Sequence, residues 1–248
     1  MRLYFIRHGQ STNNVLGTSG LSFAEIELQR SHDPELTDIG VQQAERVAEF
    51  LKDGIDMPIP EMEKFSLTKL YVSPMIRALN TAKPIAEAFN LQAEVWTDIF
   101  EIGGLFKADE SDSVTGFPGL TIADFAKNYP AYILSETVTE TGWWDVNHGR
   151  ETPEQFMGRA IKVALQIRKW AHTNERIAIV SHAAFLDSLI KALLSQLPRH
   201  PNNLFYNHYN TGITRIDFAE SKYSNSPDHI RIHYLNRVDH LPPELRTW

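Results

Sequence analysis

Short apolar runs alternate with amphipathic stretches along most of this chain. The runs at 3–7, 69–73 and 176–181 are bounded by turn or polar residues, as in strands that are buried on both faces. Other stretches carry apolar residues at the spacing of a helix, and these are 41–51, 75–89, 156–170 and 186–193. The pattern predicts alternating strands and helices.

Capping residues indicate where several of these helices begin or end. Thr37 is the expected N-cap of the first helix. The second is expected to begin at Ser73-Pro74, with the serine as N-cap and the proline at the first helical position. The third follows Thr152-Pro153, and Pro198 is expected to end the fourth.

Near the end of the chain, the spacing of apolar residues changes from that of a helix to that of a strand. Apolar and polar residues alternate over 213–218 and over 230–234, with the polar stretch 224–228 between them, which predicts a hairpin-like pair at a sheet edge. Together with the strand–helix alternation, this predicts an α/β fold. We expect a three-layer α/β/α sandwich whose mostly parallel sheet has an antiparallel edge strand, formed by 1–248 as a single domain.

Two segments do not fit this rhythm. Residues 13–35 and 102–150 are richer in Gly, Ser, Thr and acidic residues, and loops of such length are usually functional lids or binding elements. The alternative is that both segments are surface loops without a function in binding. The second segment is a cap-like insertion with a weak helical pattern from Ile122 to about Leu134. Its aromatic residues could cover a substrate or form a small core of the insertion: Phe106, Phe117, Trp143 and Trp144.

Composition and charge exclude several classes of protein. The chain is 42% hydrophobic and 22% charged, with a net charge of −7 and no long basic run, which argues against nucleic-acid binding. It has no cysteine, so disulfides, thiolate nucleophiles and cysteine-ligated metals are excluded. We expect a cytoplasmic protein, because we find neither a signal peptide nor a run of roughly 20 apolar residues that would span a membrane. The 10 histidines lack metal-ligand spacing, so no metal is expected. The sequence leaves the oligomeric state unknown.

The three apolar runs lead into cationic side chains. Arg7 and His8 close the first run, Arg77 follows the second, and His182 closes the third. Because ligands of parallel α/β sheets bind outside the carboxyl ends of the strands, we expect these side chains to form one cationic pocket. Such a pocket suits a phosphate, and a histidine within it suits phosphoryl transfer.

These residue types fit that chemistry. A neutral imidazole at His8 can attack phosphorus and form a phosphohistidine, while its other ring nitrogen keeps a proton against an acceptor. Gly9 lets backbone approach a ligand closely, and Arg77 at a helix N-terminus presents a fork to two phosphate oxygens. Taken singly, each has a structural alternative: the histidines as buried hydrogen-bonded residues, the arginine as a surface cation paired with a carboxylate.

Seven short motifs follow one another along most of the chain. They are Arg7-His8-Gly9-Gln10-Ser11 with Asn14, Leu36-Thr37-Asp38-Ile39-Gly40 with Gln43-Ala44, Ser73-Pro74 with Arg77-Ala78 and Thr81-Ala82, Glu101, Gly149 with Glu151-Thr152, Val180-Ser181-His182, and Asn210-Thr211. In this order they resemble the histidine phosphatase superfamily, in its phosphoglycerate-mutase-like branch. The resemblance implies the fold expected above.

The resemblance also implies a role for each matching residue. It implies that His8 is the nucleophile, and that Glu101 protonates the leaving oxygen and then activates water. Three cationic side chains would hold the phosphoryl oxygens: Arg7, Arg77 and His182. The remaining matches would lie around the substrate, with Asn14 as a donor to the phosphate: Gly9, Gln10, Ser11, Asn14 and Asn210. No metal or cofactor is implied, because the cationic side chains supply the positive charge.

The expected activity is hydrolysis of a small-molecule phosphate ester. The alternatives are a phosphoglycerate mutase-type phosphotransferase and a phosphoprotein-binding or regulatory domain with weak activity. The apolar stretch 102–106 departs from the basic and aromatic run that mutases usually have after this glutamate, which disfavours the mutase. Asp98 and Glu110 are alternative acids, and Arg150 and His148 could reach a second anionic group or be solvated.

Overall fold

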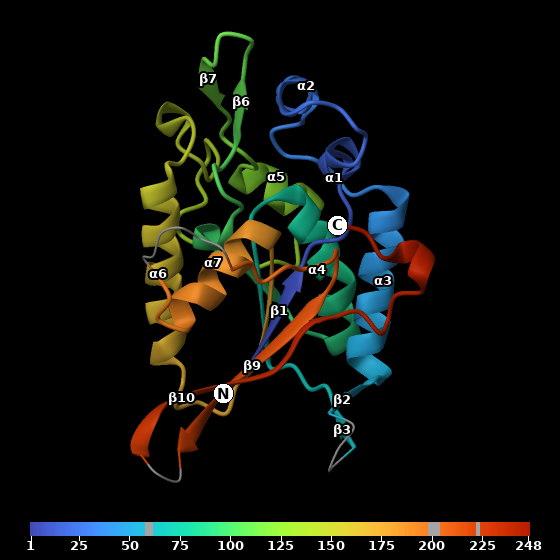
Figure 1. The fold of residues 1–248 in the computed structure, drawn as a ribbon, viewed down its shortest axis with the longest axis vertical. Coiled ribbons are helices and arrows are strands. Elements are labelled where there is room, and N and C mark those ends of the chain that lie inside the picture. The colour runs from blue at the N-terminus through green and yellow to red at the C-terminus, as the bar shows by residue number, and fades with distance from the viewer. Residues whose placement is uncertain (58–61, 198–203, 222–223) are drawn as a thin grey trace.

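A six-stranded sheet forms the centre of the fold (Figure 1). The computed structural model describes residues 1–57, 62–197, 204–221 and 224–248. The strands of the sheet, in spatial order, are β10 (Ser224–Arg237), β9 (Ile213–Ser221), β1 (Arg2–Arg7), β8 (Arg176–Ser181), β4 (Lys69–Val72) and β5 (Ala93–Val95). Two small two-stranded sheets are formed by β2 (Ile55–Met57) with β3 (Glu63–Lys64) and by β6 (Phe106–Ala108) with β7 (Val114–Gly116).

Helices cover both faces of the sheet. Helices α3 (Asp38–Asp53) and α4 (Ile76–Phe89) pack on one face, and α6 (Pro153–Lys169) and α7 (Ala183–Leu193) pack on the other. The side chains of β1 alternate between the two cores, with Tyr4 and Ile6 in the first and Leu3 and Phe5 in the second. The predicted three-layer α/β/α sandwich is therefore confirmed.

Strand directions follow the sequence prediction. β1, β8, β4 and β5 are parallel neighbours, whereas β9 pairs antiparallel with β1 and β10 antiparallel with β9. The antiparallel pair thus lies at the sheet edge. The second strand of this pair is longer than predicted, because the polar stretch 224–228 belongs to β10.

Two of the three predicted helix starts are confirmed. The Thr37 hydroxyl accepts the Gly40 N–H at 3.1 Å, and Thr152 caps α6. The start at Ser73 is wrong, because α4 begins at Ile76 and the serine hydroxyl lies 2.7 Å from Nε2 of His182 instead. The expected helix end at Pro198 lies outside the described residues.

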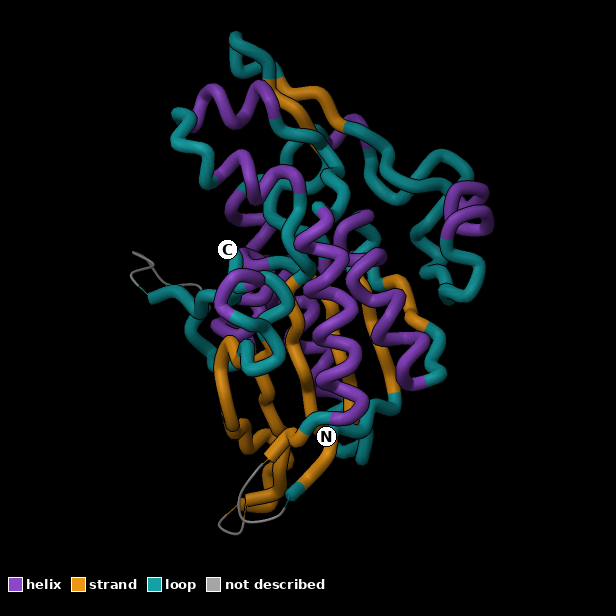
Figure 2. Tube along the Cα trace, turned by 90° about the vertical axis from the view of Figure 1, so that its right-hand side faces the viewer, coloured by secondary structure: helices purple, strands orange, loops and turns teal. Residues whose placement is uncertain are grey.

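Both irregular segments lie over the carboxyl ends of the parallel strands, at the top of Figure 1. The first contains α1 (Thr12–Gly17) and α2 (Phe23–Gln29). The second contains β6, β7, α5 (Ile122–Asn128) and η2 (Val146–His148), so its helix is shorter than predicted. Figure 2 shows these loops and short elements stacked at one end of the sheet and long helices. Two further turns of 3-10 helix are η1 (Thr97–Ile99) and η3 (Pro243–Leu245).

The tryptophan pair of the insertion belongs to the core rather than to a cover over a substrate. Trp143 is buried and packs with residues of the α3/α4 face. Gly104 and Gly119 have φ of +76° and +71°, and a Cβ on them would lie 2.4 Å from the Trp144 ring and 2.2 Å from that of Trp143. None of the helices in the described ranges is long and apolar enough to cross a membrane.

Candidate active site

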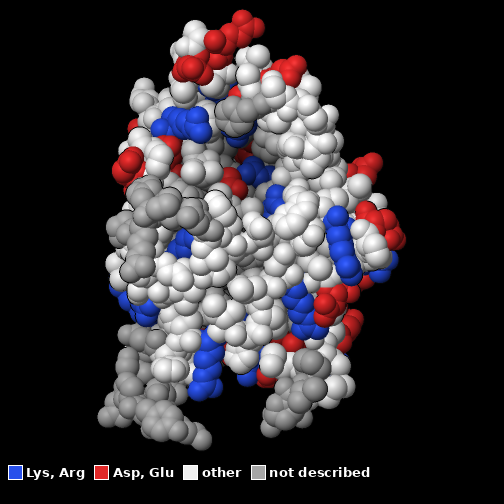
Figure 3. Space-filling model, in the orientation of Figure 1, with Lys and Arg blue, Asp and Glu red and all other residues white. Residues whose placement is uncertain are grey.

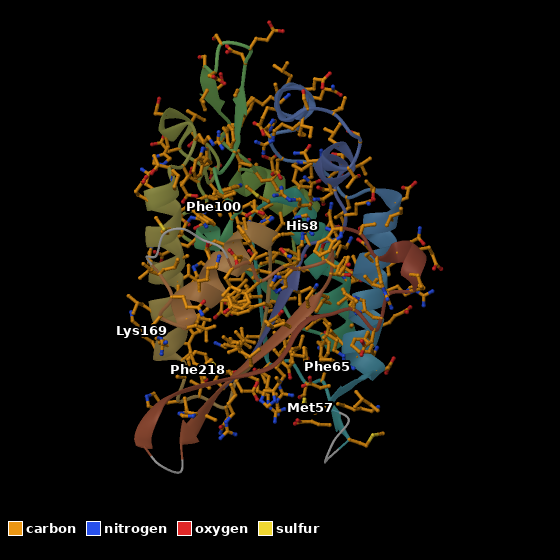
Figure 4. All side chains as sticks on the ribbon, viewed as in Figure 1. His8, Met57, Phe65, Phe100, Lys169 and Phe218 are labelled. Carbon is orange, nitrogen blue, oxygen red and sulfur yellow. The ribbon has the colours of Figure 1, made fainter. Side chains whose placement is uncertain are left out.

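The three cationic strand ends come together. His8 lies just beyond β1, and Figure 4 shows it below α1 and α2. Its Nε2 is 3.1 Å from Nε of Arg77, in the first turn of α4. Its ring centroid is 5.1 Å from that of His182, which follows β8. The carboxyl ends of β1, β4 and β8 therefore deliver these side chains to one place.

Hydrogen bonds determine which nitrogen of His8 carries the proton. Nδ1 is 2.6 Å from the Gly9 carbonyl oxygen, which can only accept, so Nδ1 is the protonated nitrogen. Nε2 then holds the lone pair, and Arg77 donates to it. Burial lowers the pKa of His8 well below its ordinary value, and the charges of Arg77 and Arg7 lower it further. The imidazole is therefore neutral at neutral pH, with a nucleophilic Nε2.

Two buried guanidinium groups lie beside His8. Arg7 donates from Nη1 to the His208 carbonyl oxygen at 2.8 Å, and its Nε has no hydrogen-bond partner in the described part of the chain. Burial lowers the pKa of Arg7 to about 10, which leaves it charged at pH 7. Nη1 of Arg77 is 3.7 Å from Oδ1 of Asp33, a buried carboxyl group whose pKa burial raises to about 7. The site is thus ready to accept an anion.

His182 is fully buried beside them. The Ser73 hydroxyl oxygen accepts the Met75 N–H at 3.4 Å and lies 2.7 Å from Nε2 of His182. Nδ1 of His182 has no partner within the described residues. Burial, followed by the charge of Arg77, lowers the pKa of His182 well below its ordinary value. His182 is therefore neutral at neutral pH, with one ring nitrogen unused.

Glu101 follows η1 and is held by the first turn of α7. Its Oε1 accepts the N–H groups of Phe185 at 3.1 Å and Ile102 at 3.0 Å, and Oε2 accepts that of Ala184 at 3.4 Å. The alternative acids lie elsewhere. Asp98 pairs with Lys162 at 2.8 Å, and Glu110 is exposed between β6 and β7.

A cavity of about 160 Å³ lies over His8. Figure 3 shows a hollow in the upper half of the molecule, with Lys or Arg and Asp or Glu atoms at its floor. The lining residues are Arg7, His8, Ser11, Asn13, Asn14, Ile26, Arg30, Pro34, Arg77 and Glu101. Four of these were missed by sequence reasoning, and all four come from the segment 13–35, whose irregular pattern predicts a lid but not which side chains face inward.

Asn14 is oriented by three donors. Its Oδ1 accepts the Ser11 N–H at 2.9 Å, the Ser11 hydroxyl at 3.0 Å and the Asn210 amide at 3.3 Å. These contacts assign the oxygen to the protein side, and the amide NH2 group is left for the cavity. This orientation fits the donor role that the family resemblance implies.

Three residues expected at the substrate lie behind the cavity wall. A Cβ on Gly9 would lie 2.5 Å from the Gly40 carbonyl oxygen, so this glycine admits the start of α3 rather than a ligand. The side chain of Gln10 accepts the Thr37 hydroxyl at 2.7 Å, and that of Asn210 donates to the His8 carbonyl at 3.0 Å. These residues support the loop that carries His8 and do not line the cavity.

Thr247 links the two buried amides behind that loop. Its hydroxyl donates to Oδ1 of Asn210 at 2.9 Å and accepts from Nε2 of Gln43 at 2.8 Å. The Asn210 amide donates to the His8 carbonyl oxygen, and the Gln43 side chain accepts the Gln10 N–H at 2.7 Å. Sequence reasoning missed Thr247, because no local pattern joins residues so far apart along the chain.

A buried ion pair fixes the loop that carries Glu101. Arg159 of α6 binds both carboxylate oxygens of Glu151 at 2.7 and 2.6 Å. Its Nη1 donates to the carbonyl oxygens of Asp98 at 3.0 Å and Phe100 at 2.8 Å, and its guanidinium lies 3.5 Å from the Phe100 ring centroid. Glu151 and Gly103 also exchange backbone and side-chain hydrogen bonds. The ion pair therefore holds the loop on both sides of Glu101.

No group of His, Cys, Asp and Glu side chains among the described residues could hold a metal ion. The positive charge around His8 comes from the arginines, which can by themselves stabilise a phosphoryl group.

Comparison with known proteins places the chain in a family. Residues 3–226 match the model of the histidine phosphatase superfamily, branch 1. This match covers most of the chain, and the chain therefore belongs to that superfamily, in agreement with the resemblance of its motifs.

Relatives with phosphatase names and one mutase-like protein align over most of the chain. A protein named uncharacterized phosphatase PhoE from Bacillus subtilis is 24% identical, over 92% of this chain and 94% of its own length. Phosphoglycerate mutase-like protein 4 of Arabidopsis thaliana is 29% identical over 74% of this chain and 67% of its own length. The solved phosphoserine phosphatase of Entamoeba histolytica, in complex with 3-phosphoglyceric acid, shares the fold with a TM-score of 0.57 at 24% identity, covering 97% and 99% of the two chains.

Proposed function

We propose that the protein hydrolyses a small phosphomonoester through a phosphohistidine formed on Nε2 of His8. One observation carries this proposal. The unprotonated Nε2 of a neutral His8 shares a cavity of about 160 Å³ with three guanidinium groups, two of them beside His8, and one carboxyl group. A phosphoryl group in that cavity meets a nucleophile, two cations and a proton donor.

In the first step Arg77 turns its N–H groups from Nε2 of His8 to the phosphoryl oxygens. The freed Nε2 lone pair then attacks phosphorus, and the bond from phosphorus to the ester oxygen breaks. Glu101, in its protonated form, gives its proton to the departing oxygen, so the product leaves as an alcohol. Arg7 and Arg77 offset the charge on the phosphoryl oxygens, and the amide of Asn14 adds a hydrogen bond. The unpartnered Nδ1 of His182 adds another when it carries the imidazole proton. The Gly9 carbonyl holds the Nδ1 proton of the positively charged phosphohistidine.

In the second step water attacks the phosphohistidine. Glu101, now a carboxylate, accepts a proton from the water while the water oxygen bonds to phosphorus. The bond between phosphorus and Nε2 breaks, inorganic phosphate leaves, and His8 is neutral again. Glu101 has regained the proton that it donated, so the cycle closes without a metal or a cofactor.

Substitution of the nucleophile tests this proposal. His8→Ala should lower kcat on p-nitrophenyl phosphate at least about a hundredfold, with an unchanged far-ultraviolet circular dichroism spectrum. His172→Ala, at an exposed position, should leave kcat as it is. If His8→Ala kept more than a few per cent of the activity, the nucleophile would be another residue.

Product analysis separates hydrolysis from mutase activity. With 3-phosphoglycerate and a 2,3-bisphosphoglycerate primer, we expect inorganic phosphate as the main product. A mutase must shield its phosphohistidine from water, whereas the apolar, glycine-containing stretch after Glu101 holds no basic side chain up to Phe106. Formation of 2-phosphoglycerate faster than phosphate would show that the mutase is the better description.

The insertion 102–150 is proposed to act as the cap of a single domain that spans 1–248. Its place over the carboxyl ends of the parallel strands supports this role (Figure 1). A cytoplasmic location stays a prediction from the sequence alone.

A further inference from the structure

One buried carboxyl group beside the cavity has an oxygen without a partner. Asp33 belongs to the segment 13–35 and is 8% exposed. Its Oδ1 accepts the N–H of Ile76, the first residue of α4, at 3.1 Å. Its Oδ2 has no hydrogen-bond partner among the described residues. Because a buried carboxylate oxygen is costly to leave unpaired, we expect Oδ2 to take a partner in some state of the site.

Arg77 is the cation that faces this carboxyl group. Its Nη1 is 3.7 Å from Oδ1 of Asp33, too far for a hydrogen bond, whereas its Nε is 3.1 Å from Nε2 of His8. Nε and Nη1 donate from different edges of the planar guanidinium. The group thus has His8 at one edge and Asp33 at another, and a shift of about 1 Å would bring Nη1 to the length of a charge-assisted hydrogen bond.

The position of Arg77 in the empty site obstructs the nucleophile. The Nε2 lone pair of His8 accepts the Arg77 N–H, and a lone pair must be free before it can attack phosphorus. A guanidinium that moves toward Asp33 releases Nε2 and keeps the edge with Nε and Nη2 for two phosphoryl oxygens. Asp33 does not line the cavity, so it acts on a substrate only through Arg77.

The charge of Asp33 changes near neutral pH. Burial raises the pKa of its carboxyl group to about 7, and the charge of Arg77 opposes that rise. Below this value the neutral carboxyl group attracts the guanidinium weakly, and above it the carboxylate attracts it as an ion. We therefore expect the position of Arg77 to follow the pH.

The other groups that face this pair do not replace Asp33. They are Glu101 and Arg30 around Arg77, and Glu35 and Tyr129 around Asp33. Glu35 is exposed, and N–H groups of α7 bind Glu101. Burial lowers the pKa values of His8, His182 and His32, so these rings are neutral at pH 7.

We propose that Asp33 is a positioning residue, which as a carboxylate draws Arg77 away from Nε2 of His8 and so frees the nucleophile. The proposal rests on the phosphatase function proposed above and adds one condition to it, that Asp33 is ionised before His8 attacks. The alternative is a purely structural role, in which Asp33 caps α4 through the Ile76 N–H. Capping needs an acceptor oxygen but no charge.

Asp33→Asn separates the two roles, because the amide keeps an acceptor for the Ile76 N–H but lacks the charge. The measurement is kcat/KM for p-nitrophenyl phosphate, whose leaving group needs no proton, between about pH 6 and about pH 8.5. The ratio of wild type to Asp33→Asn cancels the ionisation of the substrate. We expect this ratio to be about tenfold at the upper end, the effect of one charged hydrogen bond, and to fall to about twofold at the lower end, where Asp33 is mostly protonated.

Glu35→Gln is the matched control. It removes an exposed carboxylate two residues from Asp33. Because Glu35 contributes to the raised pKa of Asp33, the pH profile should keep its shape and move slightly to lower pH. A wild-type to Asp33→Asn ratio that is the same at every pH would overturn the proposal and leave Asp33 with the capping role alone.

The nitrogen NMR resonance of Nε2 in His8 gives a second readout, which needs no turnover because it responds to a hydrogen bond at the lone pair. It should shift over the same pH range in the wild-type protein and stay constant in Asp33→Asn. A constant resonance in the wild type, or an equal shift in both proteins, would overturn the proposal. The expected shift without any release of p-nitrophenolate would support the role of Asp33 and contradict the phosphatase function, so the two failures are distinguishable.

Discussion

Glu101 is the one carboxyl group among the described residues that line the His8 cavity. Replacing it with glutamine keeps an acceptor for the N–H groups of α7 but removes the transferable proton. Glu101→Gln should therefore slow esters of alkyl alcohols about 10²- to 10⁴-fold. The p-nitrophenolate leaving group needs no protonation, so its release in a pre-steady-state burst should change less than tenfold.

The same measurement on Asp98→Asn is the matched control. Asp98 carries a carboxyl group three residues away, but it pairs with Lys162 at the surface, so the substitution should leave both substrates unaffected. Equal losses for alkyl and aryl esters in Glu101→Gln would count against the acid role.

For single residues, the sequence predicts those at the strand ends. It does not predict residues that support the site from behind without lining the cavity. Arg7, His8 and His182 follow apolar runs, so the end of the run is enough to place them. The buried position of Arg159 could have been predicted from its spacing in the sequence. It stands three residues after Phe156 and four before Val163, on the apolar face of its helix, and a cation on such a face indicates a buried partner.

Among the elements, α6 determines where the loop that carries Glu101 lies. Arg159→Lys cannot reproduce the bidentate contact with Glu151 together with the two carbonyl contacts. We expect a loss of stability of about 1–3 kcal/mol, because the lysine keeps the charge but leaves buried acceptors without a donor. In the folded protein, kcat for alkyl esters should fall more than the p-nitrophenolate burst rate, because a displaced Glu101 protonates the leaving oxygen poorly.

Lys162→Gln provides the control from the next turn of the same helix. Lys162 also contacts the loop, through the exposed Asp98 side chain, and exposed pairs contribute roughly 0–1 kcal/mol. Its stability and both rates should stay near those of the wild type. If Arg159→Lys slowed both substrates by one common factor, the ion pair would serve stability alone.

The elements also show why Ser73 is misassigned from sequence. Ser-Pro after a strand has the composition of a helix start, and the same serine is the right size to bond His182. The sequence does not indicate which partner the hydroxyl takes. That choice depends on β8 lying next to β4, which only the assembled sheet determines.

For the whole molecule, buried histidines predict how stability depends on pH. Burial lowers the pKa of His208 and of His240 to about 4, and that of His8 and His182 well below the ordinary 6.5. The unfolded chain therefore binds more protons than the folded one between these values and 6.5, and stability falls as the pH is lowered through this window. Burial raises the pKa of Asp33 to about 7, so this group stabilises the fold as the pH is lowered. Its effect is opposed by that of the four buried histidines.

Urea unfolding at pH 7 and pH 5 measures this dependence. His208 alone should contribute about 1–2 kcal/mol to the fall in the free energy of unfolding, so His208→Gln should flatten the dependence. His172→Gln, at an exposed site, should leave it as in the wild type. A free energy of unfolding that stays constant or rises at pH 5 would show that these histidines are not buried in their neutral form.

The overall architecture is predictable from sequence because hydrophobic period determines it, strand by strand and helix by helix. The support behind the loop that carries His8 is not predictable in this way. Gln43, Asn210 and Thr247 come from three separate regions of the chain, and each is an ordinary polar residue in its local context. Only the folded molecule brings them together behind His8.

Trapping the phosphorylated protein tests the central claim most directly. Glu101→Gln should form the phosphohistidine from p-nitrophenyl phosphate but hydrolyse it slowly, because the base for the second step is absent. Rapid quenching into alkali, followed by mass spectrometry of the peptides, should then find one phosphoryl group on the peptide that contains His8, and none when His8→Ala is added. A phosphoryl group on another residue, or none at all while p-nitrophenolate is released, would contradict the assignment of His8 as the nucleophile.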